Sequence, residues 1–201
     1  MRFTEEERTR LEEAVRAAEA TTGAEIVVMV VDGVTDYRAA EMTLAGVAAL
    51  VLPGVLLPFS FVPALWIWLV QLVLFVVLAV LLPLLAGGRR LVGRARVERD
   101  VRAAAEAQFF ARGLRNTTRR AAVLIFVAPE ERCAVLLYDD AAAAVGEGQW
   151  RGVAGGLARG MKGGAPVMAI EEAVGTAGRL LSGHFPRGAD DADELPNVII
   201  E

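Results

Sequence analysis

Charge is missing from the middle of the chain, where the 47 residues of Met42–Gly88 include no Asp, Glu, Lys or Arg. A membrane-spanning helix needs about 20 apolar residues and tolerates about 25 when it is tilted, so the stretch is too long for one helix. Prolines, which break helical hydrogen bonding, interrupt it near its middle. They are Pro53, Pro58 and Pro63. The stretch therefore predicts a transmembrane hairpin with spans near 42–57 and 64–86; a first span that begins near Ala39, and a re-entrant first segment, are alternatives.

Side chains that build common catalytic and metal sites are also scarce. A single cysteine, Cys133, excludes an internal disulfide and a cysteine metal cluster. The only histidine, His184, has no second histidine with which to share a metal. Neither Ser60 nor Ser182 lies in the Gly-x-Ser-x-Gly turn of a serine hydrolase. Most standard catalytic constellations are therefore excluded.

The distribution of charge argues against nucleic acid and sets an orientation. The net charge is −4 and no basic face carries interleaved aromatic residues, so we expect no nucleic-acid partner. Arginines flank the uncharged stretch on both sides, and the positive-inside rule then places both termini in the cytoplasm. They are Arg38 before it and Arg89, Arg90, Arg94, Arg96 and Arg99 after it. The arginines after the second span also suit anionic lipid head groups, which is one alternative function.

Helix and strand patterns alternate on both sides of the predicted hairpin. Thr4 and Glu7 form a capping-box signature ahead of a helix that we expect to end at Gly23. Three apolar segments rich in β-branched residues predict strands, and the last two form an antiparallel hairpin. These segments are 26–31, 121–128 and 133–138. The pattern predicts one discontinuous α/β domain.

Two more helices and a tail complete the expected organisation. A stripe from Trp150 to Met161 and a run opened by Pro166 predict the helices. Glycine recurs every four residues in the first of them, which predicts close packing within the α/β domain rather than association in a membrane. Those glycines are Gly152, Gly156, Gly160 and Gly164. The predicted parts are α/β residues 1–38, the transmembrane hairpin 39–88, α/β residues 89–186 and an acidic tail 187–201.

Three segments, in this order and spacing, resemble the TPM-domain family. They are Thr22–Val28, Ala122–Arg132 and His184–Pro186. The resemblance covers nearly the whole chain, and a subgroup of bacterial membrane proteins is similar even in carrying a membrane insertion before the second strand. It implies a Rossmann-like α/β/α fold in the bacterial cytoplasmic membrane. Family members are linked to acid phosphatase activity, to divalent-metal binding or to no activity, and to the assembly or repair of membrane complexes.

In the metal-binding members, acidic residues before the second strand and after the third come together, whereas this chain has arginine on one side. Counting outward from the turn at Pro129 places Arg119 and Arg120 opposite Asp139 and Asp140. Two guanidinium groups oppose a divalent cation, so a structural ion-pair cluster is favoured over a metal site at Asp139 and Asp140. The alternative is an anion site formed by Arg119, Arg120 and Asn116.

These expectations favour a non-catalytic interaction module that assists assembly or quality control of a neighbouring membrane complex. Its expected partners are the lipid bilayer and a membrane protein complex, with no required cofactor. The alternative enzyme is a membrane-bound, acid phosphatase-like hydrolase that uses Asp139 or Asp140, with the arginines as phosphate clamps.

Overall fold

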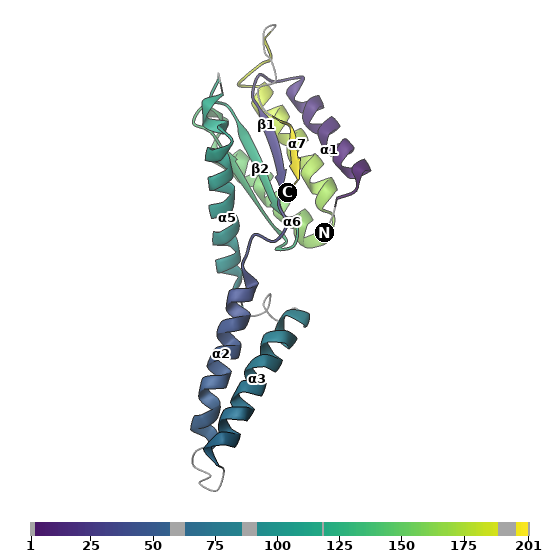
Figure 1. Cartoon of the computed structure of the whole chain (residues 1–201). Helices are drawn as coiled ribbons and strands as arrows, with labels where there is room; N and C mark the ends of the chain where they lie inside the picture. Colours follow the sequence, from purple (N-terminus) through teal and green to yellow (C-terminus); the bar gives the residue numbers. More distant parts are fainter. Residues whose placement is uncertain (1–2, 57–62, 86–91, 118, 189–195, 201) are drawn as a thin grey trace. The chain divides into compact units, whose positions relative to one another are not determined.

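The chain forms two compact units, an α/β unit and a helical hairpin inserted into it (Figure 1). The computed structural model describes residues 3–56, 63–85, 92–117, 119–188 and 196–200. The α/β unit comprises Met1–Val34 and Glu98–Glu201, and the hairpin unit comprises Thr35–Val97. The predicted insertion is therefore present, and its boundaries differ from the expected 39 and 88.

A four-stranded mixed sheet forms the centre of the α/β unit. Its strands are β1 (Ile26–Val30), β2 (Val123–Ala128), β3 (Cys133–Tyr138) and β4 (Val198–Ile200), in the order β3-β2-β1-β4. β1 runs parallel to β2 and β4, and β2 pairs antiparallel with β3. The three strands expected from the sequence are therefore confirmed, including the β2–β3 hairpin.

The fourth strand corrects the expectation of an acidic tail over 187–201. Val198–Ile200 pairs with β1, and the N–H of Val28 donates to the carbonyl oxygen of Asn197 at 2.9 Å. Three apolar residues are too few to produce a recognisable period. They are held in the sheet because β1 would otherwise leave a row of backbone groups unpaired. The acidic residues of this tail between 190 and 194 lie outside the described residues.

Three helices, α1 (Glu5–Glu19), α6 (Glu147–Gly163) and α7 (Pro166–Ser182), share one apolar core with the sheet. Alternate strand residues such as Val28 and Ile125 belong to that core. Met29 and Phe126 point to the opposite face and are also buried. Another helix, α5 (Arg94–Ala111), runs alongside the sheet (Figure 1). It buries Val101, Ala105 and Phe109.

The first helix begins as predicted and ends earlier. Glu7 N–H donates to the Thr4 hydroxyl at 3.2 Å, and Thr4 N–H donates to the Glu7 carboxylate at 2.8 Å, which completes the capping box. The helix ends at Glu19, so the expectation that Gly23 ends it is wrong. Gly23 instead donates its N–H to the carbonyl oxygen of Phe185 at 2.9 Å. A long-range backbone contact therefore replaces the local helix cap.

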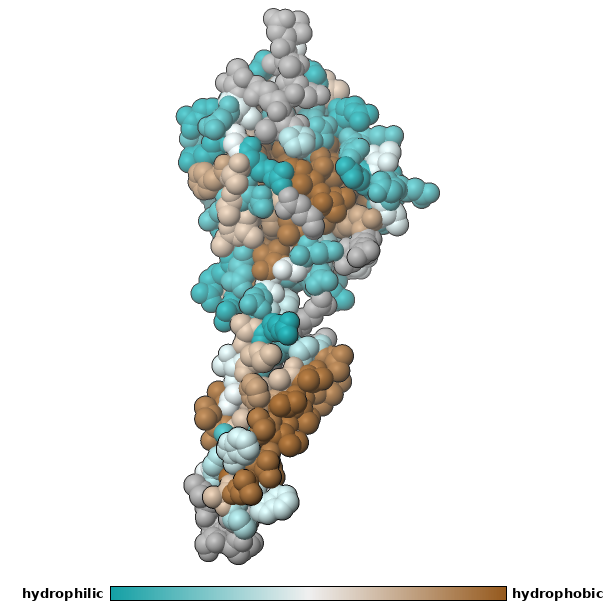
Figure 2. Space-filling model, in the orientation of Figure 1, coloured by the Kyte–Doolittle hydropathy of each residue, from teal (hydrophilic) through white to brown (hydrophobic). Residues whose placement is uncertain are grey.

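The hairpin unit contains α2 (Tyr37–Leu56) and α3 (Ala64–Leu84), both long and apolar enough to cross a membrane. α2 starts before the expected first span, near the alternative start at Ala39, and continues past Pro53. Few of their residues are buried: 17% of the most apolar stretch of α2 and 6% of that of α3. Figure 2 shows apolar residues gathered on the drawn face of α3. Pro58 and the other residues of 57–62 lie outside the described residues.

One glycine of the α6 stripe makes a close contact within the α/β unit, and this contact is between helices α6 and α7. A Cβ added at Gly160 would overlap the Cβ of Ala169 in α7. Gly164 ends α6 in a left-handed conformation, with φ +80°. Gly152 has nothing within 4 Å of an added Cβ. One glycine of the stripe therefore sets the close approach of α6 and α7, and another ends the helix.

We expect Gly160→Ala to lower the free energy of unfolding by about 1–3 kcal/mol, because the added methyl group forces α6 and α7 apart. The matched Gly152→Ala adds a methyl group to an open position, so it should raise stability by about 0.5–1 kcal/mol through helix propensity. Thermal unfolding of the full chain, followed by circular dichroism, compares the two. Equal effects would contradict the assigned contact.

Candidate functional site

The candidate site lies where the segment before β2 meets the end of β3. The N–H of Asp139 donates to the carbonyl oxygen of Ala122 at 2.9 Å, and that of Ala141 donates to the carbonyl oxygen of Arg120 at 3.1 Å. These bonds continue the β2–β3 ladder beyond both strands. They bring Arg120 beside Asp139 and Asp140, although the residues are far apart in sequence.

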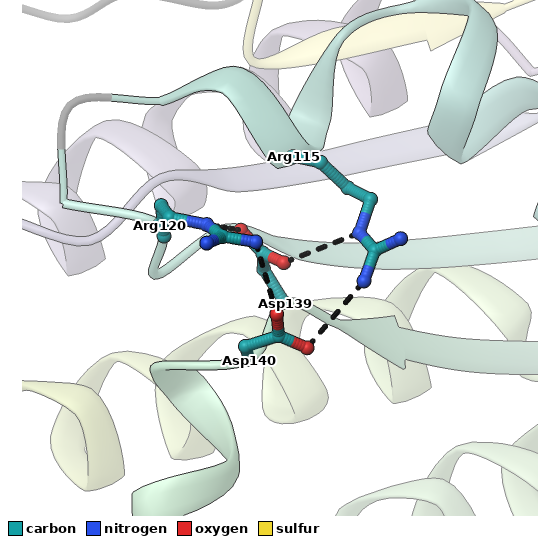
Figure 3. Close-up of polar contacts among 4 residues, drawn as sticks. All are labelled: Arg115, Arg120, Asp139 and Asp140. Carbon is teal, nitrogen blue, oxygen red and sulfur yellow. Dashed lines mark hydrogen bonds and ion pairs between the residues drawn. The ribbon is translucent and has the colours of Figure 1, made fainter.

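Two arginines and two aspartates form what we call the Arg–Asp cluster: Arg115, Arg120, Asp139 and Asp140 (Figure 3). Arg120 Nη2 lies 2.9 Å from Asp140 Oδ2, and Arg115 Nη2 lies 3.5 Å from Asp140 Oδ1. The Nε atoms of Arg115 and Arg120 lie 3.6 and 3.8 Å from the two oxygens of Asp139. Each guanidinium group therefore faces both carboxylates.

The two carboxylates differ sharply in burial. The Asp139 side chain is fully buried, whereas that of Asp140 is 66% exposed. Within the described part of the chain, neither carboxylate oxygen of Asp139 has a hydrogen-bond partner. A buried carboxylate without hydrogen bonds is costly unless opposite charge lies close by. The guanidinium groups of Arg115 and Arg120 provide that charge.

Local structure explains how Arg115 and Arg120 reach the aspartates. Gly113 adopts a left-handed conformation, with φ 68°, ahead of the 3-10 turn η1 (Leu114–Asn116), and this turn carries Arg115. The Arg115 guanidinium carbon also lies 5.4 Å from the centre of the Phe110 ring, a cation–π distance. Arg120 itself has a left-handed backbone, with φ 50°. Two tight turns therefore aim the arginines at the same carboxylates.

Only some of the residues predicted for this site lie where the sequence placed them. Arg120 lies against Asp139 and Asp140 as expected. Arg119 donates to the carbonyl oxygen of Pro186 at 3.1 Å, and among the described residues no contact places it against the two aspartates. Arg115 takes the expected place of Arg119. The exposed Asn116 makes no hydrogen bond or ion pair with the Arg–Asp cluster in the described residues.

Arg115 was missed because counting along an extended strand assumes one residue per step. The 3-10 turn before β2 folds the chain back, so Arg115, which is farther from β2 in the sequence than Arg119, reaches the aspartates. The signal available in the sequence was Gly113, a residue suited to left-handed turns, two positions before Arg115.

The cluster fits a divalent cation poorly. Hard cations take six or more oxygen ligands, whereas the cluster offers two carboxylates that already face two guanidinium groups. No group of three His, Cys, Asp or Glu side chains capable of holding a metal occurs among the described residues. Metal binding at Asp139 and Asp140 would require displacement of both arginines.

Comparison with known proteins gives a solved structure whose match extends over the whole chain. No protein-family profile and no curated protein sequence matches. The structural match is the NMR structure of BA42 protein from the psychrophilic bacterium Bizionia argentinensis, with a TM-score of 0.63 and 19% sequence identity. It covers 100% of this chain and 97% of BA42. At this identity, the likeness concerns the fold alone.

Polar residues outside the Arg–Asp cluster serve local structure. Asp36 accepts from the N–H of Ala39 at 3.2 Å, as a cap at the start of α2. A ring nitrogen of His184 lies 3.1 Å from the carbonyl oxygen of Leu180, just past the end of α7, and Ser182 donates to the carbonyl oxygen of Arg179. Arg89 and Arg90, two of the predicted head-group ligands, lie outside the described residues.

The paired variant Arg115→Gln/Arg120→Gln should lower the free energy of unfolding by about 1–3 kcal/mol, because it leaves the buried Asp139 carboxylate without opposite charge. The half exposure of both arginines places the effect below that of a fully buried ion pair. Denaturant unfolding of the full chain measures it.

Adding Asp139→Asn to the paired variant is the control, because it removes the stranded charge. Most of the lost stability should return, and Asp139→Asn alone should cost less than the paired variant. A paired variant as stable as the original chain would contradict the proposed charge balance.

Proposed function

We propose that this chain is an integral protein of the bacterial cytoplasmic membrane, anchored by α2 and α3 with both termini in the cytoplasm. Its α/β unit, which we assign to the Rossmann-like TPM type, acts as an interaction module. That module assists assembly or quality control of a neighbouring membrane complex.

The apolar surface of the hairpin unit carries the proposal. Leu50 in α2 is 74% exposed and Leu65 in α3 is 65% exposed. Most of the large apolar side chains of these two helices are also exposed. Contiguous apolar surface of this extent is rare on proteins that stay in water. A lipid bilayer would cover it, and Trp66 and Trp68 near the start of α3 suit a membrane interface.

The Arg–Asp cluster favours binding over catalysis. Asp140 is paired with both arginines, and Asp139 is closed off from solvent, so neither carboxylate is freely presented to a substrate. Exposed groups around it include Phe110, which is 61% exposed and stacks with Arg115. Aromatic and arginine side chains of this kind are frequent anchors in protein interfaces.

A phosphatase is the second candidate, and one observation favours it. The carboxylate of Asp139 lacks hydrogen bonds and lies between two guanidinium groups that suit phosphate oxygens. A phosphomonoester that displaced Asp140 from the arginines would then lie next to Asp139. This candidate is tested together with the first, below.

Val73→Arg should release the protein from the membrane fraction or prevent its accumulation. Val73 is 60% exposed near the middle of α3, and an arginine at the centre of a spanning helix costs about 3 kcal/mol of insertion free energy. Met168→Arg is the matched control, at a similarly exposed apolar position of the α/β unit. Alkaline extraction of membranes measures both; recovery of the unmodified chain in the soluble fraction without detergent would refute membrane anchoring.

A photo-crosslinking amino acid in place of Phe110 should capture a membrane protein in intact cells, whereas the same group in place of Glu13, on an exposed position of α1, should not. Mass spectrometry of the adducts identifies the captured chain. Absence of adducts from Phe110 would count heavily against an interaction module. Phosphate release from p-nitrophenyl phosphate that Asp139→Asn abolishes would favour the phosphatase instead.

A further inference from the structure

β3 lies at an edge of the sheet and offers a row of unpaired backbone groups. Its only neighbour in the described sheet is β2. Because the N–H of Asp139 faces β2, alternation directs the backbone groups of Ala134, Leu136 and Tyr138 to the open side. In the described parts of the chain, the N–H groups of these three residues have no hydrogen-bond partner. The edge is therefore ready to accept another strand.

Natural sheets often protect such an edge with proline, charged residues or a bulge, and β3 has none of these. The strand Cys133–Tyr138 contains no proline and no charged residue, and it pairs with β2 without a bulge. A groove of about 380 Å³ follows it, between α5 on one side and α6 on the other. The groove is lined by Leu136, Leu137, Tyr138 and Trp150, with Arg102, Glu147, Arg151 and Ala154.

We propose that β3 pairs with β3 of a second copy of this chain, antiparallel about a two-fold axis at Leu136. Leu136 then faces Leu136 of the second copy, and Ala134 faces Tyr138. Each of these pairs exchanges two backbone hydrogen bonds, because all their N–H and C=O groups point outward. The two sheets join into one continuous sheet.

The edge of β3 is complementary to itself, and this favours a second copy of the chain as the added strand. Among the three residues whose backbone groups face the open edge, the two-fold axis places the smallest, Ala134, opposite the largest, Tyr138. The ring of Tyr138 stacks on that of Trp150, with ring centres 5.4 Å apart. The rim of the groove carries both signs, with Glu147 and Arg151 paired at 3.0 Å. A two-fold interface needs a surface that matches itself in this way.

The opposite edge of the sheet fits less well. β4 contains only three residues, so a strand added there would gain few hydrogen bonds. Its residue Ile200 is 39% exposed, which makes it a matched position for control substitutions.

The register is tested with two single-cysteine variants of the full chain, each with Cys133→Ala to remove the native thiol. In the proposed dimer, Val135 of one copy and Leu137 of the other form a non-hydrogen-bonded pair with Cα atoms about 4.5 Å apart, close enough for a disulfide. Val135→Cys mixed with Leu137→Cys in detergent, with a mild oxidant, should convert up to about half of the chain to a covalent dimer by random pairing. Either variant alone should remain monomeric on a denaturing gel.

Absence of the mixed dimer, in variants whose circular dichroism matches the original chain, would overturn the proposal. Equal crosslinking by one variant alone would overturn the register, and a disulfide to a foreign protein would assign the edge to a different partner.

A second measurement does not depend on disulfide formation. Leu136→Lys places like charges against each other at the axis, so native mass spectrometry should show at least a tenfold loss of dimer. Ile200→Lys at the other edge should leave the dimer intact. A folded Leu136→Lys variant that keeps the original dimer fraction, or an original chain that is monomeric at micromolar concentration, would refute pairing through β3.

Discussion

Parallel pairing of β1 with β2 is the interaction on which the rest of the structure depends. Five residues of β1, from Ile26 to Val30, align with Val123 to Val127. The chain between the two strands contains the whole hairpin unit and α5. Parallel strands always need a crossover connection, and here the crossover contains the two membrane-length helices. Neither segment of the α/β unit can complete the sheet without the other.

If the hairpin spans a membrane as proposed, this arrangement links its insertion to folding of the α/β unit. The ends of the crossover must come together before β1 and β2 can pair, and closing a long flexible connection costs entropy. A hairpin whose helices are fixed by lipid shortens the connection that remains free to move. In the proposed function, anchoring the hairpin in the membrane therefore also lowers the entropy cost of pairing β1 with β2.

Helices and strands whose pattern extends over several neighbouring residues could be predicted from the sequence. The capping box of Thr4 and Glu7, the strand Cys133–Tyr138 and the helix opened by Pro166 were all recognisable from neighbouring residues. β4 was missed because its three residues are ordered by β1, which is far away in sequence. A local pattern carries no information about such a partner.

The candidate site shows the same division at the level of side chains. Arg120 follows from the register of the β2–β3 hairpin, which the turn at Pro129 fixes. Arg115 depends on a 3-10 turn that no periodic pattern announces, and Arg119 was misplaced because its neighbour Arg120 has a left-handed backbone. Register can be counted from the sequence, whereas the direction of a side chain at a tight turn depends on backbone angles.

The Arg–Asp cluster and the open edge of β3 are connected through Asp140. In the single chain, its carboxylate is shared by Arg115 and Arg120, and at 66% exposure it keeps one side open to solvent. In the proposed dimer, the second copy would lie along β3 next to that open side and exclude part of the water there. Ion pairs are stronger where water is excluded, so Asp140 would hold Arg115 and Arg120 more tightly. Pairing of two chains through β3 would therefore make the arginines less available to an anion or an acidic partner, so that assembly and ligand binding at this end of the sheet would act on each other.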